Sequence, residues 1–409
     1  MHVLFVHKNF PAQFGQIARH LIGFKGWSCS FISETPPGVV DGIKKIRYQA
    51  AGGATLANHY CSRGFENGIW NAQGVFDACQ RHPELKPDLI VGHSGFGSTL
   101  FLPEWAPEIP IINYFEYYYH PRDSDLDFRK EFPVDPMDFL RARPRNAMIL
   151  LDLVNCRKGY SPTKFQKGLF PPEFQSKIEV IFDGIDTGFY RRRAGLPRRA
   201  GGVEIPASTR IVTYISRGFE SLRGFDIFMR AAKRIYERFP DVLFVAVGSD
   251  RVCYGGDHKY IKHKSFKEHV LAQDNYDPSK FLFTGSIAAR DLVDVLGLSD
   301  LHIYLTAPFV LSWSLMNALA CGCTVLASDT APVREMIAHG HNGLLVDFFD
   351  VEGFATAAVD VLKAPEAFRR LGEEGARMIR DQYALDKTIP KLAALFEEVV
   401  NSARSRGTI

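Results

Sequence analysis

The segment Pro308-Phe-Val-Leu-Ser-Trp-Ser-Leu-Met-Asn-Ala-Leu-Ala-Cys-Gly-Cys-Thr-Val-Leu-Ala-Ser-Asp329 gives the strongest indication of the fold. Its pattern predicts a loop, a short helix that begins at Ser312 or Ser314, a stop at Gly322 and a buried strand. Where a parallel strand ends and a helix begins, unpaired amides and the positive end of the helix dipole converge. The segment therefore predicts a phosphate-binding position at the carboxyl edge of a parallel sheet.

The chain has 409 residues, of which 46% are hydrophobic and 23% charged, and its formal net charge is +3. This length predicts two domains of ordinary size, and the composition is typical of a soluble globular protein. The net charge is too small to indicate nucleic-acid binding. A basic cluster at 191–199 lies among glycines and prolines, which favours a solvated linker. Weak peripheral contact with an anionic membrane is the alternative.

The amino terminus begins directly with a short apolar strand and has no signal-peptide pattern. No stretch reaches the ~18 apolar residues that a membrane-spanning helix needs. The seven cysteines form no Cys-x-x-Cys pair, so we expect a reducing, cytoplasmic location. His258, His263 and His269 lack a matching pattern of carboxylates or cysteines, and we expect no metal site.

Apolar strands alternate with helical stretches along the whole chain. Strands are predicted at 3–6, 29–32, 89–93, 109–114, 178–182, 210–215, 243–247, 281–285, 301–305 and 324–327, and helices at 14–21, 225–239, 352–363, 367–381 and 388–400. This alternation predicts an α/β protein of two doubly wound, Rossmann-like domains facing a central cleft. The segment 254–277, rich in His, Lys and Asp, is predicted to be a surface excursion.

The segment 308–329 resembles the donor site of the retaining nucleotide-sugar glycosyltransferases of family 4, usually Glu-Gly-Phe-Gly…Leu-Glu-Ala-Met-Ala-Cys-Gly-x-Pro-Val. Both of the usual glutamates are replaced here, by Phe309 and Asn317. Asp183–Tyr190 resembles the hinge entry of the same enzymes. The resemblance implies the GT-B fold, with an acceptor-side domain at 1–190, a nucleotide-sugar-binding domain at 191–387 and a helix at 388–409 that crosses back to the first domain.

Arg217 and Arg223 lie between a predicted strand and a predicted helix, with Gly224 next to the second arginine. Two guanidinium groups there suit a diphosphate, whose negative charge grows as it leaves. In the family the spacing is one residue shorter and a lysine usually takes the place of Arg223; arginine favours bidentate phosphate contact. The alternative is an exposed loop with two solvated arginines.

The resemblance also implies contacts with the donor. In the family the first glutamate contacts the donor sugar and the second holds the ribose hydroxyls. Asn317 can still hydrogen-bond a ribose, whereas Phe309 cannot replace a carboxylate. The other donor-binding positions that we infer are Ala12, Gln13, Gly248, Ile287, Ser312, Ser314 and Leu315. Core packing beneath a helix is the alternative for the hydrophobic residues at 313–316.

Two candidate catalytic residues, His93 and Glu116, follow strands of the first domain. Strand ends of a doubly wound sheet are where ligands bind. By the resemblance, Glu116 lies near the position of a family histidine close to the reacting sugar, so it is the candidate for contacting the acceptor hydroxyl or the donor sugar. A turn-capping role for Glu116 and a hydrogen-bonded structural role for His93 remain open.

The resemblance therefore predicts a retaining glycosyltransferase that moves a hexose from a nucleotide diphosphate sugar, with UDP or GDP expected, to a hydroxyl acceptor. The acceptor is a saccharide, a lipid-linked sugar or a small natural product. No cofactor or metal is expected, because Arg217 and Arg223 would supply the charge that a divalent metal supplies in other enzymes. Two alternatives stay open: a nucleotide-sugar-binding protein that lost turnover with its glutamates, and a GT-B sugar-nucleotide epimerase.

Overall fold

The computed structural model describes residues 1–35, 41–193 and 195–406. The chain forms two compact units. The first comprises Met1–Asp127, Val134–Gly184 and Leu385–Ile409, and the second comprises Phe128–Pro133 and Ile185–Ala384. The chain therefore passes from one unit to the other mainly after Gly184 and after Ala384, whereas the sequence suggested boundaries at 190 and 387. In addition, the short segment Phe128–Pro133 of the first half belongs to the second unit.

The first unit contains a seven-stranded parallel sheet in the order β3-β2-β1-β4-β5-β6-β7. Because β1 lies between β2 and β4, the strand order reverses direction there, as in doubly wound folds. The strands are β1 (His2–Val6), β2 (Ser28–Ser33), β3 (Ile43–Arg47), β4 (Leu89–His93), β5 (Ile111–Tyr114), β6 (Lys158–Ser161) and β7 (Ile178–Val180).

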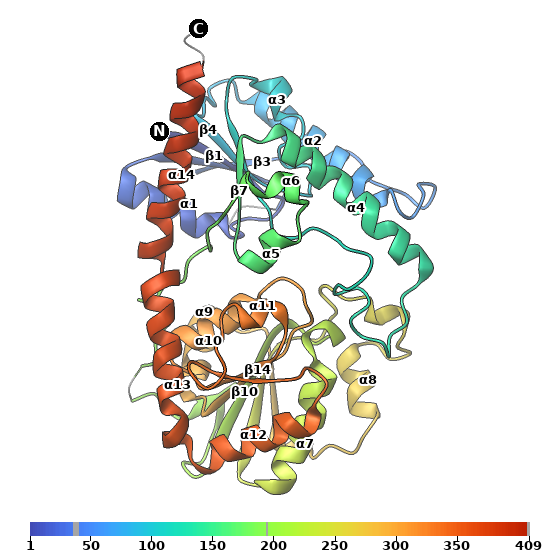
Figure 1. The fold of residues 1–409 in the computed structure, drawn as a ribbon, viewed down its shortest axis with the longest axis vertical. Coiled ribbons are helices and arrows are strands. Elements are labelled where there is room, and N and C mark those ends of the chain that lie inside the picture. Colours follow the sequence, from blue (N-terminus) through green and yellow to red (C-terminus); the bar gives the residue numbers. More distant parts are fainter. Residues whose placement is uncertain (36–40, 194, 407–409) are drawn as a thin grey trace. The chain divides into compact units, whose positions relative to one another are not determined.

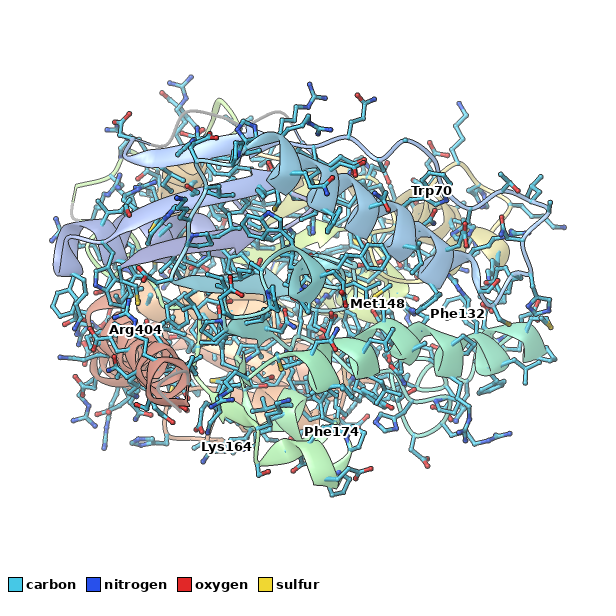
Figure 2. All side chains as sticks on the ribbon, turned by 90° about the horizontal axis from the view of Figure 1, so that it is seen from above. Trp70, Phe132, Met148, Lys164, Phe174 and Arg404 are labelled. Carbon is cyan, nitrogen blue, oxygen red and sulfur yellow. The ribbon has the colours of Figure 1, made fainter. Side chains whose placement is uncertain are left out.

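Helices cover both faces of this sheet. They are α1 (Phe14–Lys25), α2 (Arg63–Arg81), α3 (Leu102–Trp105), α4 (Pro136–Asn155), α5 (Lys164–Gly168), α6 (Pro172–Gln175) and α14 (Leu385–Arg406). Successive side chains of β1 point to opposite faces, so Phe5 packs with α1 and α14, while Leu4 packs with α2 and α4. Figure 1 shows α14 beside α1, and in Figure 2 Met148 of α4 reaches towards α2.

The second unit contains a six-stranded parallel sheet in the order β12-β11-β10-β13-β14-β15, and a separate two-stranded antiparallel ribbon. The sheet strands are β10 (Arg210–Gly218), β11 (Val242–Ser249), β12 (Phe281–Gly285), β13 (Leu301–Tyr304), β14 (Val325–Ser328) and β15 (Leu344–Val346); β8 (Arg199–Ala200) and β9 (Val203–Glu204) form the ribbon. Parallel strands direct all their carboxyl ends to one edge, which places the loops after β10, β11, β12 and β13 together.

The helices of the second unit are α7 (Phe225–Arg238), α8 (Phe266–Ala272), α9 (Ala289–Leu298), α10 (Trp313–Ala320), α11 (Ala331–Arg334), α12 (Val351–Lys363) and α13 (Pro365–Met378). A π-helical turn, Ile379–Tyr383, follows α13, and 3-10 turns lie at η1 (Ser221–Arg223), η2 (Asp257–Lys259) and η3 (Pro278–Lys280). The apolar face of α7 packs beside α12 against the sheet (Figure 1). No helix within the described ranges is long and apolar enough to cross a membrane.

Much of the segment 254–277 is exposed, as its polar composition predicted, but part of the segment is buried in the core of the second unit. Phe266 and Val270 of α8 are buried in the core beside α7, and Asp257 is also buried. The segment is therefore part of the second unit, and it lies next to residues that the sequence assigned to the donor site.

Phe128–Pro133 is held in the second unit by Arg129, whose side chain is buried. Its guanidinium donates to both carboxylate oxygens of Asp226, at 3.1 and 2.8 Å, and to the carbonyl of Ser221 at 2.7 Å. The rings of Phe348 and Phe349 lie 5.3 and 5.8 Å from its central carbon. Because Ser221 begins η1, this segment also stabilises the turn that carries Arg223.

Candidate functional site

The donor residues predicted in the second unit lie at the carboxyl edge of its sheet. Four neighbouring strands, β12, β11, β10 and β13, supply the loops at this edge. Each loop carries at least one predicted residue: Ile287 after β12, Gly248 at the end of β11, Arg217 and Arg223 at the end of β10, and Phe309, Ser312, Ser314, Leu315 and Asn317 after β13.

Arg223 is buried, with 5% of its surface exposed. Its Nη1 donates to Thr306 Oγ1 at 2.6 Å and to the Val310 carbonyl at 3.2 Å. The rings of Tyr254 and Phe309 lie 5.2 and 5.9 Å from its central carbon, a distance at which aromatic faces stabilise a cation. Among the described residues, no carboxylate pairs with this guanidinium, and its Nε and Nη2 donate no hydrogen bond. The site therefore holds a fixed positive charge with donors left for a ligand.

The backbone around Arg223 is tied to the rest of this edge. Tyr214 donates to the Arg223 carbonyl at 2.8 Å, and the Ala307 amide donates to the Leu222 carbonyl at 2.8 Å. Gly224 has φ +61°, and a Cβ there would lie 2.8 Å from the Cβ of Leu305. Glycine is thus required directly after Arg223, because only glycine accepts both this conformation and this close approach.

Arg217 differs from Arg223 in being exposed at the end of β10. Its carbonyl accepts a hydrogen bond from Ser249 Oγ at 2.7 Å, which joins β10 to the end of β11. At Gly248, φ is +155° and a Cβ would lie 2.3 Å from the Ser216 carbonyl oxygen, so the two strand ends can approach only with glycine there.

Ser312, one of the two starts predicted from the sequence, is the N-cap of helix α10. Ser312 Oγ accepts from the Ser314 amide at 3.2 Å, and the two hydroxyl groups lie 2.9 Å apart. The Leu315 side chain is fully buried, so only its backbone could reach a ligand. Asn317 is also buried; burial raises the pKa of Tyr190, and the Asn317 side chain opposes this rise.

No sequence pattern indicated Glu220, which precedes Arg223 by three residues and is fully buried. Its Oε2 accepts hydrogen bonds from the amides of Cys253, Tyr254 and Gly255 at 3.0, 2.8 and 2.9 Å. Asp257 lies close by and accepts from the Ser221 amide at 3.3 Å; burial raises the pKa of Asp257, and the Glu220 charge raises it too. The two carboxylates thus attach the start of the 254–277 segment to the arginine turn.

In the first unit, the predicted pair His93 and Glu116 lies at the carboxyl ends of the adjacent strands β4 and β5. His93 Nε2 is 3.6 Å from Glu116 Oε2, and His93 Nδ1 lies 2.9 Å from the Ser94 carbonyl. His93 is buried, whereas the Glu116 side chain is 44% exposed. The His7 ring packs edge-on against His93. Burial is the main cause that lowers the pKa of His7 to about 3, and the nearby His93 lowers it further.

Asp152 of α4 positions the loop after His93, a role that the sequence did not indicate. It accepts from Ser94 Oγ and the Gly95 amide, both at 2.9 Å, and from Thr99 Oγ1 at 3.3 Å. Burial raises the pKa of Asp152 to about 6 despite these hydrogen bonds. The loop that begins at His93 is thereby fixed to a helix.

Ala12 and Gln13, also in the first unit, lie at the start of α1. Ala12 has a φ of +44°, unusual for a residue with a side chain, and the side-chain nitrogen Nε2 of Gln13 is buried without a partner among the described residues. Neither observation assigns them a ligand. No described group of three or more His, Cys, Asp or Glu side chains is arranged to hold a metal ion.

The family model for the glycosyl transferase family 4 group matches residues 25–190, and the model for glycosyl transferases group 1 matches residues 201–378. The chain belongs to the family 4 glycosyltransferases. The two matched regions lie on either side of the basic segment 191–199.

Curated relatives align with a little over half of the chain. It is 23% identical to N-acetyl-alpha-D-glucosaminyl L-malate synthase of Bacillus anthracis, over 56% of this chain and 55% of that protein. It is 24% identical to spore coat protein SA of Bacillus subtilis, over 56% of this chain and 60% of that protein. The chain thus spans little more than half the length of the relatives that it matches.

Solved structures extend the similarity over the whole fold. Sucrose-phosphate synthase from Thermosynechococcus elongatus superposes with a TM-score of 0.75 at 17% identity, covering 98% of this chain and 99% of that one. Anabaena HepE in complex with UDP and glucose gives a TM-score of 0.70 at 16% identity, covering 97% and 100%. The two Rossmann-like domains and the GT-B fold expected from the sequence are confirmed.

Proposed function

We propose that this glycosyltransferase is a retaining enzyme that moves a hexose from a nucleotide diphosphate sugar to a hydroxyl acceptor. The observation that carries the proposal is Arg223: a buried guanidinium, held at the carboxyl edge of a parallel sheet, that has no carboxylate partner among the described residues. Burying a charge is costly unless it is paired. A diphosphate would supply the missing partner, and the exposed Arg217 would add a second positive charge.

In the proposed reaction, the bond between the anomeric carbon and the diphosphate oxygen breaks, and its electron pair leaves with the diphosphate. The acceptor oxygen bonds to the same face of the anomeric carbon, and its proton passes to a phosphate oxygen. Arg217 and Arg223 stabilise the negative charge that develops on the leaving group. With two arginines in this role, we propose a reaction that needs no metal and no other cofactor.

Asn317, Gly248 and Ile287 are proposed to hold the nucleotide. Their position on neighbouring loops of one sheet edge supports this assignment. UDP is the first nucleotide to test, because the structurally similar HepE binds UDP and glucose. In the first unit, His93 and Glu116 are proposed to contact the acceptor hydroxyl or the donor sugar.

A second candidate function has one specific observation in its favour. The ring of Phe309 contacts Arg223, at the position where the family usually has a glutamate. If that carboxylate is indispensable for transfer, the protein would bind a nucleotide sugar without turning it over.

An acceptor-dependent release assay distinguishes the two. UDP-glucose, UDP-N-acetylglucosamine and GDP-mannose are incubated with the protein and a panel of hydroxyl acceptors, and the released nucleoside diphosphate is measured. We expect release with one donor only when an acceptor is present, and proton NMR of the product should show the anomeric configuration of the donor. Binding without release would support the second candidate, and an inverted product would refute the retaining assignment.

A further inference from the structure

Tyr254 lies beside Arg223, although its side chain comes from a segment that the sequence analysis placed outside the site. Its ring centroid is 5.5 Å from that of Phe309, and both rings flank the Arg223 guanidinium. The two rings differ in exposure: Phe309 is 9% exposed and Tyr254 is 41% exposed. Phe309 is therefore the buried side of this cluster, and Tyr254 presents its ring to solvent.

The position of Tyr254 is set by Glu220. Three consecutive amides, including that of Tyr254, donate to one buried carboxylate oxygen at 2.8 to 3.0 Å. Hydrogen bonds to a charged acceptor are about twice as strong as neutral ones, so the backbone on both sides of Tyr254 is fixed. Glu220 and Arg223 belong to the same turn region, which couples the placement of the ring to that of the guanidinium.

This arrangement suits a ligand with two adjoining parts. Anionic oxygens can reach the remaining donors of Arg223, while the C–H face of a ring attached to the anion can stack on an aromatic side chain. A carboxylate at position 309 would instead pair with Arg223 and compete with the anion. The cluster Arg223, Phe309 and Tyr254 thus offers a ligand a positive charge and an aromatic ring, without the usual carboxylate.

We infer that Tyr254 is a donor-binding residue that stacks on the sugar ring of the nucleotide sugar, and that Glu220 is the positioning residue that holds it there. This inference rests on the proposed function, because Arg223 must hold the diphosphate to which the sugar is attached. An aromatic side chain outside the segment 308–329 would thus contribute to recognition of the sugar.

Calorimetric titration of the full chain tests the inference. UDP-glucose and GDP-mannose are titrated into wild type, Tyr254→Ala and Tyr254→Phe, with UDP and GDP titrated separately. For the nucleotide sugar that wild type binds, Tyr254→Ala should weaken binding about tenfold, and Tyr254→Phe less than about twofold. The matching nucleotide without sugar should lose less than about threefold in both variants.

Tyr260→Ala is the matched control. Tyr260 belongs to the same segment and is 36% exposed, and its ring lies 6.0 Å from Phe132. This variant should bind the nucleotide sugar like wild type. An equal loss with and without the sugar in Tyr254→Ala, or an unchanged affinity, would overturn the inference while the proposed function stood. Failure of wild type to bind any of the four ligands would overturn both.

A double-mutant cycle tests the role of Glu220. If Glu220 acts through Tyr254, Glu220→Ala should weaken binding of the nucleotide sugar several-fold in wild type but less than about twofold in Tyr254→Ala. Glu220→Gln keeps an acceptor oxygen for the three amides and should recover part of the affinity; it also serves if the alanine variant does not fold. Equal losses in both backgrounds would refute the positioning role.

Discussion

Replacement of Arg223 by alanine should reduce turnover far more than it reduces folding. Loss of a group that stabilises charge in the transition state typically lowers kcat by about 10²- to 10³-fold. Arg223 also has a structural role: its removal leaves the Val310 carbonyl without this donor, whereas Thr306 Oγ1 keeps its bond to the Ala307 carbonyl. One unpaired buried carbonyl costs about 1–3 kcal/mol, and the two cation–π contacts add about 0.5–1 kcal/mol each.

The expected loss of stability is therefore a few kcal/mol. This loss is smaller than the usual free energy of unfolding of a domain of this size, so we expect the variant to fold. Arg223→Lys keeps the charge but cannot present the planar fork of donors, so we expect an intermediate loss of about tenfold. Steady-state release of nucleoside diphosphate gives kcat and KM, and urea unfolding gives the stability of each variant.

Arg369→Ala serves as the control, since the Arg369 side chain is 65% exposed on α13 and pairs with the neighbouring Glu366 and Glu373. This variant should match wild type in both assays. A folded Arg223→Ala protein with kcat/KM within about threefold of wild type would show that Arg223 does not contact the leaving group.

Three further predictions concern single positions. Asn317→Glu should be tolerated or should strengthen binding of the nucleotide sugar in a titration, because the hydroxyl of the neighbouring Tyr190 can hydrogen-bond a carboxylate. A variant that no longer binds the nucleotide sugar would show that the pocket is adapted to asparagine. Arg129→Ala should lower the free energy of unfolding by about 1–3 kcal/mol in urea, since it removes the bidentate partner of Asp226 while Arg230 stays 3.2 Å from that carboxylate; a loss below about 1 kcal/mol would refute this. Burial lowers the pKa of His302 to about 3, so between pH 6.5 and 3 the unfolded chain binds one more proton and stability falls as pH falls; His302→Leu should reduce this slope by up to about 1.4 kcal/mol per pH unit, and an unchanged slope would contradict it.

The buried strands were the most predictable part of the fold. Leu89–His93 and Phe281–Gly285 have the predicted bounds, because a continuous apolar run between turn residues has few other uses in an α/β protein. The strand Ile43–Arg47 was missed, since charged residues dominate it at the edge of the sheet. The helix Pro136–Asn155 was also missed; it contains Pro144 and three arginines, which obscure its apolar face.

The residues of the candidate site divide in the same way, into those with a local sequence pattern and those without one. Arg223 was predicted as a phosphate-binding residue because an arginine followed by glycine, between a strand and a helix, is a local sequence pattern. The contact between Glu220 and Tyr254 spans 34 residues, and its acceptor binds backbone amides, which every residue type carries. Likewise, Ser94 and Asp152 lie 58 residues apart. Such long-range hydrogen bonds have no local sequence pattern, so only the folded structure shows them.

The central claim is that Arg223 and its neighbours hold the diphosphate of a nucleotide sugar, and a thermal-shift screen tests it most directly. UDP, GDP, dTDP and ADP, with their common sugar conjugates, are added to wild type and to Arg223→Ala. A ligand at 100 times its Kd stabilises the folded state by about 2.7 kcal/mol, which raises the melting temperature measurably. We predict a selective rise with one nucleotide and its sugar conjugate in wild type that is lost in Arg223→Ala; no rise with any ligand, or an equal rise in the variant, would contradict the claim.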